Sequence, residues 1–90
     1  MTASPVIRLH PEDGVIVARV TLQPGMEVEP GVVVAERIPA GHKLATRAIT
    51  AGEPIQRYGQ IIGFATAPIA VGYHVHEHNC GMGDFARDYA

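Results

Sequence analysis

The hydrophobic residues of this chain fall into short runs that are separated by turn residues. The runs are rich in valine and isoleucine, and each is too short for a typical helix, which favours strands. Glycine and proline stand between the runs at short intervals, as tight turns require. The pattern predicts an all-β domain of short strands and tight Gly/Pro turns, with strands over residues 5–10, 15–22, 32–38, 42–49, 55–58 and 61–65.

One four-residue pattern recurs at the ends of the predicted strands. It consists of an apolar residue, two connecting residues and a glycine, and it begins at Leu22, Ile38, Ile49 and Ile69. A glycine in the fourth position suits a turn in which φ is positive. The spacing of the four copies is irregular, so the pattern indicates tightly turned strands within one domain and not a solenoid array.

Residues 72–79, with the sequence GYHVHEHN, carry three histidines at every second position. In an extended strand, alternate side chains point to the same face, so we expect His74, His76 and His78 to share one face. Neutral imidazoles there suit a divalent transition ion, and protonated imidazoles suit a carboxylate. The alternative is that they are surface histidines on a partly exposed strand. A metal would need further ligands, from His42 or from a second chain.

Other candidate binding residues follow turns, where a scaffold often presents functional groups. His42 and Lys43 come directly after a glycine, and Lys43 can neutralise a carboxylate as a point charge. Arg57 can bind a carboxylate with two hydrogen bonds, and Tyr58 can donate one or stack. The alternative is that Lys43 and His42 are incidental surface residues. For Arg57 and Tyr58, spacing alone favours a surface arginine beside a half-buried core tyrosine.

Composition narrows the classes of function. Ninety residues make one small domain, and the net charge of −2 predicts no basic surface for nucleic acid. The N-terminus lacks the apolar segment of a signal peptide, and no apolar run reaches the roughly 20 residues of a membrane helix. The single cysteine, Cys80, excludes an internal disulfide and predicts an inert thiol in a reducing compartment. We therefore expect a cytoplasmic protein that acts without nucleic acid or membrane.

Three motifs in this order carry a family resemblance. They are GHKLA at 41–45, ITAGEPIQRYGQIIGFA at 49–65 and IAVGYHVHEHN at 69–79. Their order and spacing resemble the small N-terminal domain of the altronate/galactarate dehydratase family, which belongs to the SAF group with a β-clip fold. The resemblance implies a single SAF-like β-clip domain over residues 1–80. A C-terminal tail over 81–90 is expected to follow, with a helical turn over 84–90.

The resemblance also implies roles for individual residues, although it identifies no catalytic residue. By position it implies substrate-binding roles for His42, Lys43, Arg57, Tyr58 and Asn79. It implies metal-binding roles for His74, His76 and His78. The metal implied is a divalent ion, Fe²⁺ or a similar one. Arg57 stands where the family often has lysine, a change that keeps the charge and alters the hydrogen-bonding geometry.

The function implied by the resemblance is that of a carbon–oxygen lyase (hydro-lyase) component. The chain would be the small subunit or N-terminal domain of a sugar-acid dehydratase, with metal or substrate bound at the interface with a large catalytic subunit. Its expected partners are that subunit or domain and a sugar-acid substrate, and homo-oligomerisation is left open. The alternatives are the small subunit of a sulfolactate sulfo-lyase-like enzyme, a non-catalytic SAF-type carbohydrate-binding module, and a stand-alone metal-binding protein.

Overall fold

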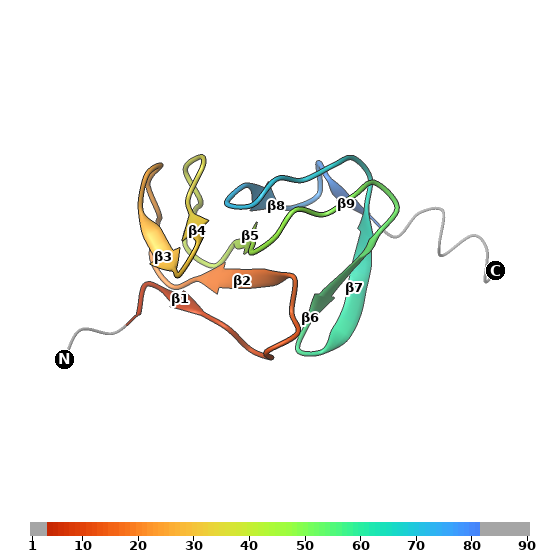
Figure 1. Cartoon of the computed structure of the whole chain (residues 1–90), viewed down its shortest axis with the longest axis horizontal. Helices are drawn as coiled ribbons and strands as arrows, with labels where there is room; N and C mark the ends of the chain where they lie inside the picture. Colours follow the sequence, from red (N-terminus) through yellow and green to blue (C-terminus); the bar gives the residue numbers. More distant parts are fainter. Residues whose placement is uncertain (1–3, 82–90) are drawn as a thin grey trace.

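Residues 4–81 form short strands joined by tight turns, and these are the residues that the computed structural model describes (Figure 1). The described residues contain no α-helix, and so no helix that is long and apolar enough to cross a membrane. The prediction of an all-β domain is confirmed. The strands are β1 (Val6–Ile7), β2 (Val15–Ala18), β3 (Glu27–Glu29), β4 (Val32–Val33), β5 (Lys43–Ala45), β6 (Pro54–Arg57), β7 (Gln60–Ala65), β8 (His74–Val75) and β9 (Cys80–Gly81).

The central sheet has four antiparallel strands in the order β1-β2-β5-β8, so it brings together segments that are far apart in the sequence. Lys43 of β5 lies opposite Val17 on one side and opposite Val75 on the other. The hairpin β3–β4 lies at one end of this sheet, and the sheet β6-β7-β9 lies at the other end (Figure 1). The order places the start of β5 beside the histidine run that begins in β8.

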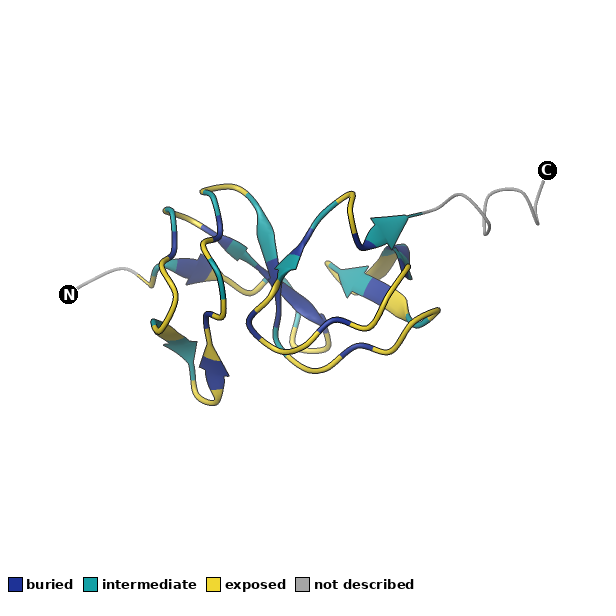
Figure 2. Cartoon of the chain, turned by 90° about the horizontal axis from the view of Figure 1, so that it is seen from above, coloured by how far each residue is buried: buried dark blue, intermediate teal, exposed yellow. Residues whose placement is uncertain are grey.

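The core consists of two hydrophobic clusters that meet at β5. Leu44 is fully buried in the first cluster and Ala45 in the second, because neighbouring residues of a strand point to opposite faces. Figure 2 shows buried residues on the central strands and mostly exposed residues on the connecting loops. Each large apolar side chain that is fully buried stabilises the fold by about 1.5–3 kcal/mol. The largest of these side chains are Ile16, Leu22, Ile38, Leu44, Ile49 and Ile55.

The four copies of the apolar-x-x-Gly pattern form two pairs, one in the first half of the chain and one in the second half. The two pairs make equivalent hydrogen bonds. Leu22 and Ile38 form an isolated antiparallel bridge in the first half. Ile49 and Ile69 form the equivalent bridge in the second half. In both bridges each N–H donates to the carbonyl of the partner, at 2.8 to 3.0 Å. The pattern in the sequence is therefore a repeat in the structure.

Two glycines of the pattern complete the correspondence. The N–H of Gly41 donates to the carbonyl of Ala18, and the N–H of Gly72 donates to the carbonyl of Ala45, both at 2.8 Å. These glycines have φ values of 85° and 87°, which other residues rarely adopt. Ala45 lies in β5, which also pairs with β2 in the first half. The two halves therefore share β5.

Gly72 is more tightly constrained than its equivalent, Gly41. A Cβ atom on Gly72 would overlap the carbonyl oxygen of Val33, whereas nothing lies within 4 Å of that position at Gly41. The N–H of Ala35 also donates to the carbonyl of Gly72, at 3.0 Å. These contacts hold the start of the histidine run against the segment that follows β4.

Some predicted elements differ from the observed ones. The strands are shorter than the hydrophobic runs, and β3 and β9 were not predicted. The extended strand expected over the histidine run is wrong beyond Val75, because residues 76–79 bend and turn. Gly81 belongs to β9, at the start of the predicted tail. The rest of that tail, with the helical turn expected over 84–90, lies outside the described residues.

Candidate functional site

Three histidines from two separate segments converge beside β5 and β8. His42 immediately precedes β5, His74 begins β8 and His76 follows it. The antiparallel pairing of Leu44 with His74 brings the ring of His42 to the other two rings. His42 Nδ1 lies 2.9 Å from His74 Nε2, and the ring centroids of His42 and His76 are 4.6 Å apart. We refer to His42, His74 and His76 as the three-histidine cluster.

The three-histidine cluster is a candidate metal site. One ring nitrogen of each histidine lies within 4.8 Å of the other two, and all three residues are half-buried. Imidazole nitrogens bind divalent transition ions at about 2.1 Å, so two nitrogens at right angles on one ion are about 3 Å apart. The 2.9 Å between His42 Nδ1 and His74 Nε2 fits this requirement. Three such donors leave coordination positions for water or substrate.

The environment of His74 favours its neutral form. Burial lowers the pKa of His74 below the usual value, and the nearby imidazoles of His42, His76 and His78 lower it further. Glu36 opposes this shift, and its carboxylate accepts the backbone N–H of His74 at 3.0 Å. The neutral imidazole is the form that binds a metal. Burial and the neighbouring rings together therefore prepare His74 as a ligand.

The side chain of Asn79 shapes the turn that carries the histidines. Its Oδ1 accepts the backbone N–H of His76 at 3.0 Å, and its Nδ2 donates to the carbonyl of His74 at 2.7 Å. The N–H of Cys80 also donates to the carbonyl of His76, at 2.9 Å. Asn79 is buried, and both polar ends of its amide are bonded to the backbone. Its observed contacts are structural, and its predicted role in substrate binding stays a prediction.

His78 lies outside the three-histidine cluster. Its ring centroid is 5.4 Å from that of His74, but the residue is exposed on the turn after β8. With Glu36 and Tyr73 it lines a separate hollow of about 250 Å³. The structure thus brings two of the three predicted metal ligands together with His42, because the turn carries His78 off the common face.

A cleft of about 290 Å³ lies next to the three-histidine cluster, where β5 approaches the sheet β6-β7-β9. Lys43 and Arg57, two of the predicted substrate-binding residues, line it together with His76. His76 therefore belongs to both the cluster and the cleft. We refer to this feature as the cationic cleft, and its lining residues are Lys43, Arg57, Ile62, His76, Glu77 and Cys80.

The hairpin β6–β7 positions Arg57 at the cationic cleft. Tyr58 and Gly59 form its two-residue turn with φ values of 63° and 72°, and Tyr58 is 65% exposed. The expectation of a half-buried core tyrosine is therefore wrong. The buried carboxylate of Asp13 holds this turn, since Oδ2 accepts the N–H of Tyr58 and Oδ1 accepts that of Gly59, both at 2.8 Å. Asp13 was not among the residues singled out from the sequence, because its partners are 45 and 46 residues away in the chain.

Cys80 lines the cationic cleft as a thiol. Burial raises the pKa of this thiol above its usual value, and the positive charge of Lys43 partly opposes the shift. A raised pKa leaves little thiolate near neutral pH, and thiolate is the reactive and metal-binding form. This agrees with the prediction of an inert cysteine.

Comparison with known proteins identifies the family. The family described as the altronate/galactarate dehydratase SAF domain matches residues 4–83. Altronate dehydratase of Escherichia coli (strain K12) is 41% identical over 76 residues, which cover 81% of this chain and 15% of that protein. The (2R)-sulfolactate sulfo-lyase subunit alpha of Paracoccus pantotrophus is 46% identical over 43 residues, which cover 48% of this chain and 64% of that subunit.

Galactarate dehydratase (L-threo-forming) of Escherichia coli (strain K12) is 38% identical over 73 residues, which cover 79% of this chain and 14% of that enzyme. The chain thus spans about 15% of the length of the dehydratases that it matches. The family match covers all of the described residues, including the three-histidine cluster and the cationic cleft. This all-β chain belongs to the SAF-domain family of the altronate/galactarate dehydratases.

Proposed function

We propose that this chain is the SAF-domain component of a hydro-lyase for sugar acids and that it acts with a large catalytic subunit or domain. Its relatives are named as dehydratases and as a sulfo-lyase subunit. It spans only about 15% of the dehydratases, which supports the need for a larger partner. The proposed place of action is the cytoplasm.

The names of the relatives narrow the proposed substrate class. Altronate, galactarate and sulfolactate are all carboxylates that carry a hydroxyl group on the neighbouring carbon. A dehydratase would expel water from altronate or galactarate, whereas a sulfo-lyase would expel sulfite from sulfolactate. A site that served all three reactions would therefore recognise the 2-hydroxycarboxylate end. We propose a 2-hydroxy acid as the substrate and leave the identity of the acid open.

The convergence of three imidazoles from two distant segments is the observation that carries this proposal. The donor set of His42, His74 and His76 suits a divalent transition ion such as Fe²⁺. Such an ion polarises a bound hydroxyl or carboxylate oxygen. The residues of the chain itself would hold the acid beside the ion, with the charges of Lys43 and Arg57 opposing the negative charge that develops on proton removal.

Other predicted contacts remain proposals. Tyr58 exposes its side chain beside Arg57, so its hydroxyl is available to a substrate or to a partner. His78 is exposed, and its ring centroid is 5.4 Å from that of His74 in the three-histidine cluster. Both residues are exposed and would be available to the large subunit.

Co-purification tests the proposal. A tagged copy of the chain is expressed in its native host, and the recovered proteins are identified and assayed for elimination from 2-hydroxy acids. We expect a large dehydratase-like subunit to co-purify, with activity that is lost in His76→Ala and retained in Arg19→Gln, an exposed arginine outside the cleft and the cluster. Recovery of the chain alone, without activity or bound metal, would contradict the proposal.

A second candidate function is that of the alpha subunit of a sulfolactate sulfo-lyase. The match to that relative covers 64% of its length, so the chain is similar to most of a small separate subunit. The same purified complex distinguishes the two functions by its product. Release of sulfite from sulfolactate would support this candidate, and release of water from a sugar acid would support the dehydratase.

A further inference from the structure

We propose that the cationic cleft binds the carboxylate group of the substrate without help from a metal, with Arg57 as the principal donor and Lys43 as the second positive charge. The inference rests on the proposed function for the class of acid. The carboxylate end of the acid would bind to Arg57 and Lys43, in a place separate from the metal-binding nitrogens of the three-histidine cluster.

The first observation is an unsatisfied donor. Arg57 Nε is buried and has no hydrogen-bond acceptor among residues 4–81. Leaving such a donor unpaired is costly, and buried polar groups in native proteins nearly always have a partner. Nε itself is closed to solvent, but Arg57 lines the cationic cleft, so an acceptor in the cleft supplies the missing partner once the guanidinium turns toward it. An unpaired guanidinium donor therefore points to a ligand that carries oxygen.

The second observation is that Arg57 is held in place before any ligand arrives. It precedes the turn whose two backbone N–H groups are bound by Asp13. It also pairs with Gln60 across the hairpin β6–β7. An arginine on a fixed backbone binds a planar two-oxygen group with a smaller loss of conformational freedom than a mobile one does. The guanidinium fork matches a carboxylate, which accepts two parallel hydrogen bonds.

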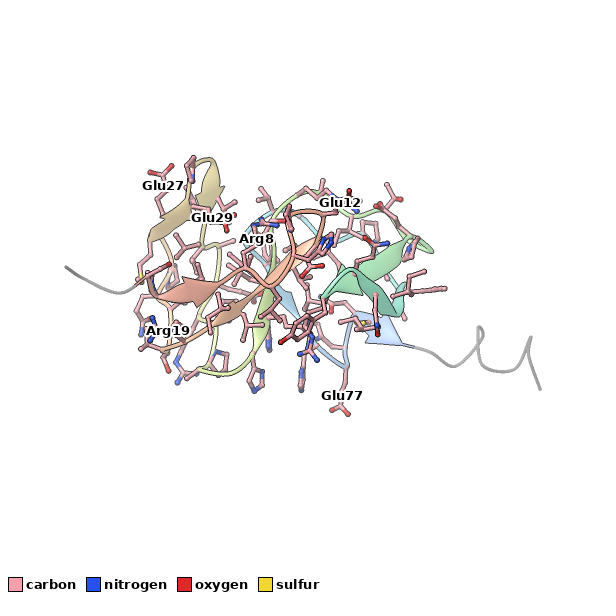
Figure 3. All side chains as sticks on the ribbon, turned by 90° about the horizontal axis from the view of Figure 1, so that it is seen from below. Arg8, Glu12, Arg19, Glu27, Glu29 and Glu77 are labelled. Carbon is pink, nitrogen blue, oxygen red and sulfur yellow. The ribbon has the colours of Figure 1, made fainter. Side chains whose placement is uncertain are left out.

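The third observation is the balance of charge in the cleft. Within the described part of the chain, neither Lys43 nor Arg57 forms an ion pair with a carboxylate. Glu77 contributes a carboxylate to the lining, but its side chain is 93% exposed and projects away from the domain (Figure 3). Two cations against one rim carboxylate leave an excess of one positive charge. This excess suits a monoanionic group, as a single carboxylate is.

The position of His76 connects the cleft to the chemistry. His76 lines the cleft and also belongs to the three-histidine cluster. An acid whose carboxylate lies on Arg57 and Lys43 therefore presents its adjacent carbon and hydroxyl toward the cluster. Ile62 supplies an apolar surface in the lining for the carbon chain. The volume of about 290 Å³ accommodates a small sugar acid.

The test uses glycerate, the smallest 2,3-dihydroxy acid, and the 90-residue chain labelled with ¹⁵N in the presence of a metal chelator. The Nε–H signal of Arg57 reports directly on the proposed contact. We expect a saturable shift of that signal, together with shifts of the amides of Lys43, Ile62 and Cys80. Arg57→Lys keeps the charge but lacks the fork, and we expect it to weaken binding about tenfold. Lys43→Gln should weaken binding to a smaller extent.

Two matched variants complete the design. Arg19→Gln removes an exposed arginine whose guanidinium donates to the carbonyl of Ser4. Arg19 lies well apart from Glu77, a residue of the cleft lining (Figure 3), so we expect unchanged binding. Glu77→Gln removes the rim carboxylate, and we expect tighter binding. If the Arg57 signal does not shift, or if Arg57→Lys binds as the parent does, the inference is wrong. Because the chelator removes any metal, such a result would leave the proposed lyase and its three-histidine cluster standing.

Discussion

Asp13 and Tyr58 are separated by 45 residues, and the buried carboxylate of Asp13 accepts the backbone N–H of Tyr58 at 2.8 Å. The other oxygen of this carboxylate accepts the N–H of Gly59 at the same distance. These two hydrogen bonds tie the loop between β1 and β2 to the tip of the hairpin β6–β7. Asp13 therefore fixes the backbone next to Arg57, which lines the cationic cleft.

Replacement of Asp13 by alanine should destabilise the domain strongly. Asp13→Ala removes both bonds and leaves two N–H groups at the hairpin turn without a partner, so we expect a loss of about 2–4 kcal/mol in the free energy of unfolding. Urea denaturation measures the loss. Glu12→Ala alters the exposed neighbour and should change stability by less than about 0.5 kcal/mol. Equal effects of the two substitutions would contradict the role given to Asp13.

The two equivalent glycines of the repeat should differ in their tolerance of alanine. Gly41 and Gly72 both have positive φ, which costs alanine about 1–2 kcal/mol. Only at Gly72 would the added Cβ overlap the carbonyl oxygen of Val33. We therefore expect Gly41→Ala to fold with a modest loss of stability, and Gly72→Ala to lose at least about 4 kcal/mol or to remain unfolded. Thermal unfolding followed by circular dichroism compares them, and similar melting temperatures would refute the overlap.

Metal binding should depend on His42 and not on His78. We expect His42→Ala, His74→Ala and His76→Ala each to weaken the binding of Co²⁺ by at least about tenfold, because each removes one donor. His78→Ala should change the affinity by less than about twofold, since its ring lies outside the three-histidine cluster. Absorption titration with Co²⁺ at fixed pH gives the affinities. An effect of His78→Ala as large as that of His42→Ala would show that the turn rearranges around the ion.

Asn79 should not tolerate aspartate. Asn79→Asp keeps an acceptor for the N–H of His76 but replaces the donor to the carbonyl of His74 with a second oxygen. A carboxylate oxygen would then face the carbonyl oxygen of His74 in a buried place, and neither can donate a hydrogen bond. We expect a loss of about 2 kcal/mol in the free energy of unfolding. Gln23→Glu makes the same amide-to-acid change at an exposed site and serves as the control. Denaturation curves that coincide for the two variants would argue against the role of Asn79.

Alkylation of Cys80 should show the raised pKa of its thiol. Only the thiolate reacts, so a raised pKa means that the rate at pH 8 is low and that it continues to increase beyond about pH 9. Lys43 lowers this pKa, so Lys43→Met should raise the pKa further and slow the reaction at a given pH. The chain unfolded in urea is the reference and should react faster. Cys80 is the single cysteine, so the labelling reports on one site.

The class of fold followed from local chemistry, but the lengths of the strands did not. Valine-rich runs and the Gly/Pro turns between them predicted β2 and β4 where they lie. The runs extend to Leu22 and Ile38, yet these residues form only a single bridge. Their pairing depends on distant partners, which periodicity does not reveal. β3 escaped prediction because its acidic residues do not resemble a strand.

For the candidate site, the structure shows where the predicted residues lie, and their arrangement differs from the one expected from the sequence. Strict alternation suggested a common face for His74 and His78, but the side chain of Asn79 bonds to the backbone and turns the chain. His42 joined the cluster instead, through the pairing of β5 with β8. The role of Asp13 was invisible for the same reason, since a contact across 45 residues leaves no local pattern.

The sharing of β5 between the two halves has a consequence for how the domain comes apart. A strand that pairs with β2 on one side and with β8 on the other cannot leave one half without exposing the core of both. Unfolding is therefore expected as one cooperative event, with the amide protons of Leu44 and Ala45 among the last to exchange. We therefore expect neither half to fold on its own, although each repeats the hydrogen bonds of the other. His42 and Lys43 lie at the start of β5, the strand that both halves share. The three-histidine cluster and the cationic cleft therefore depend on both halves being folded.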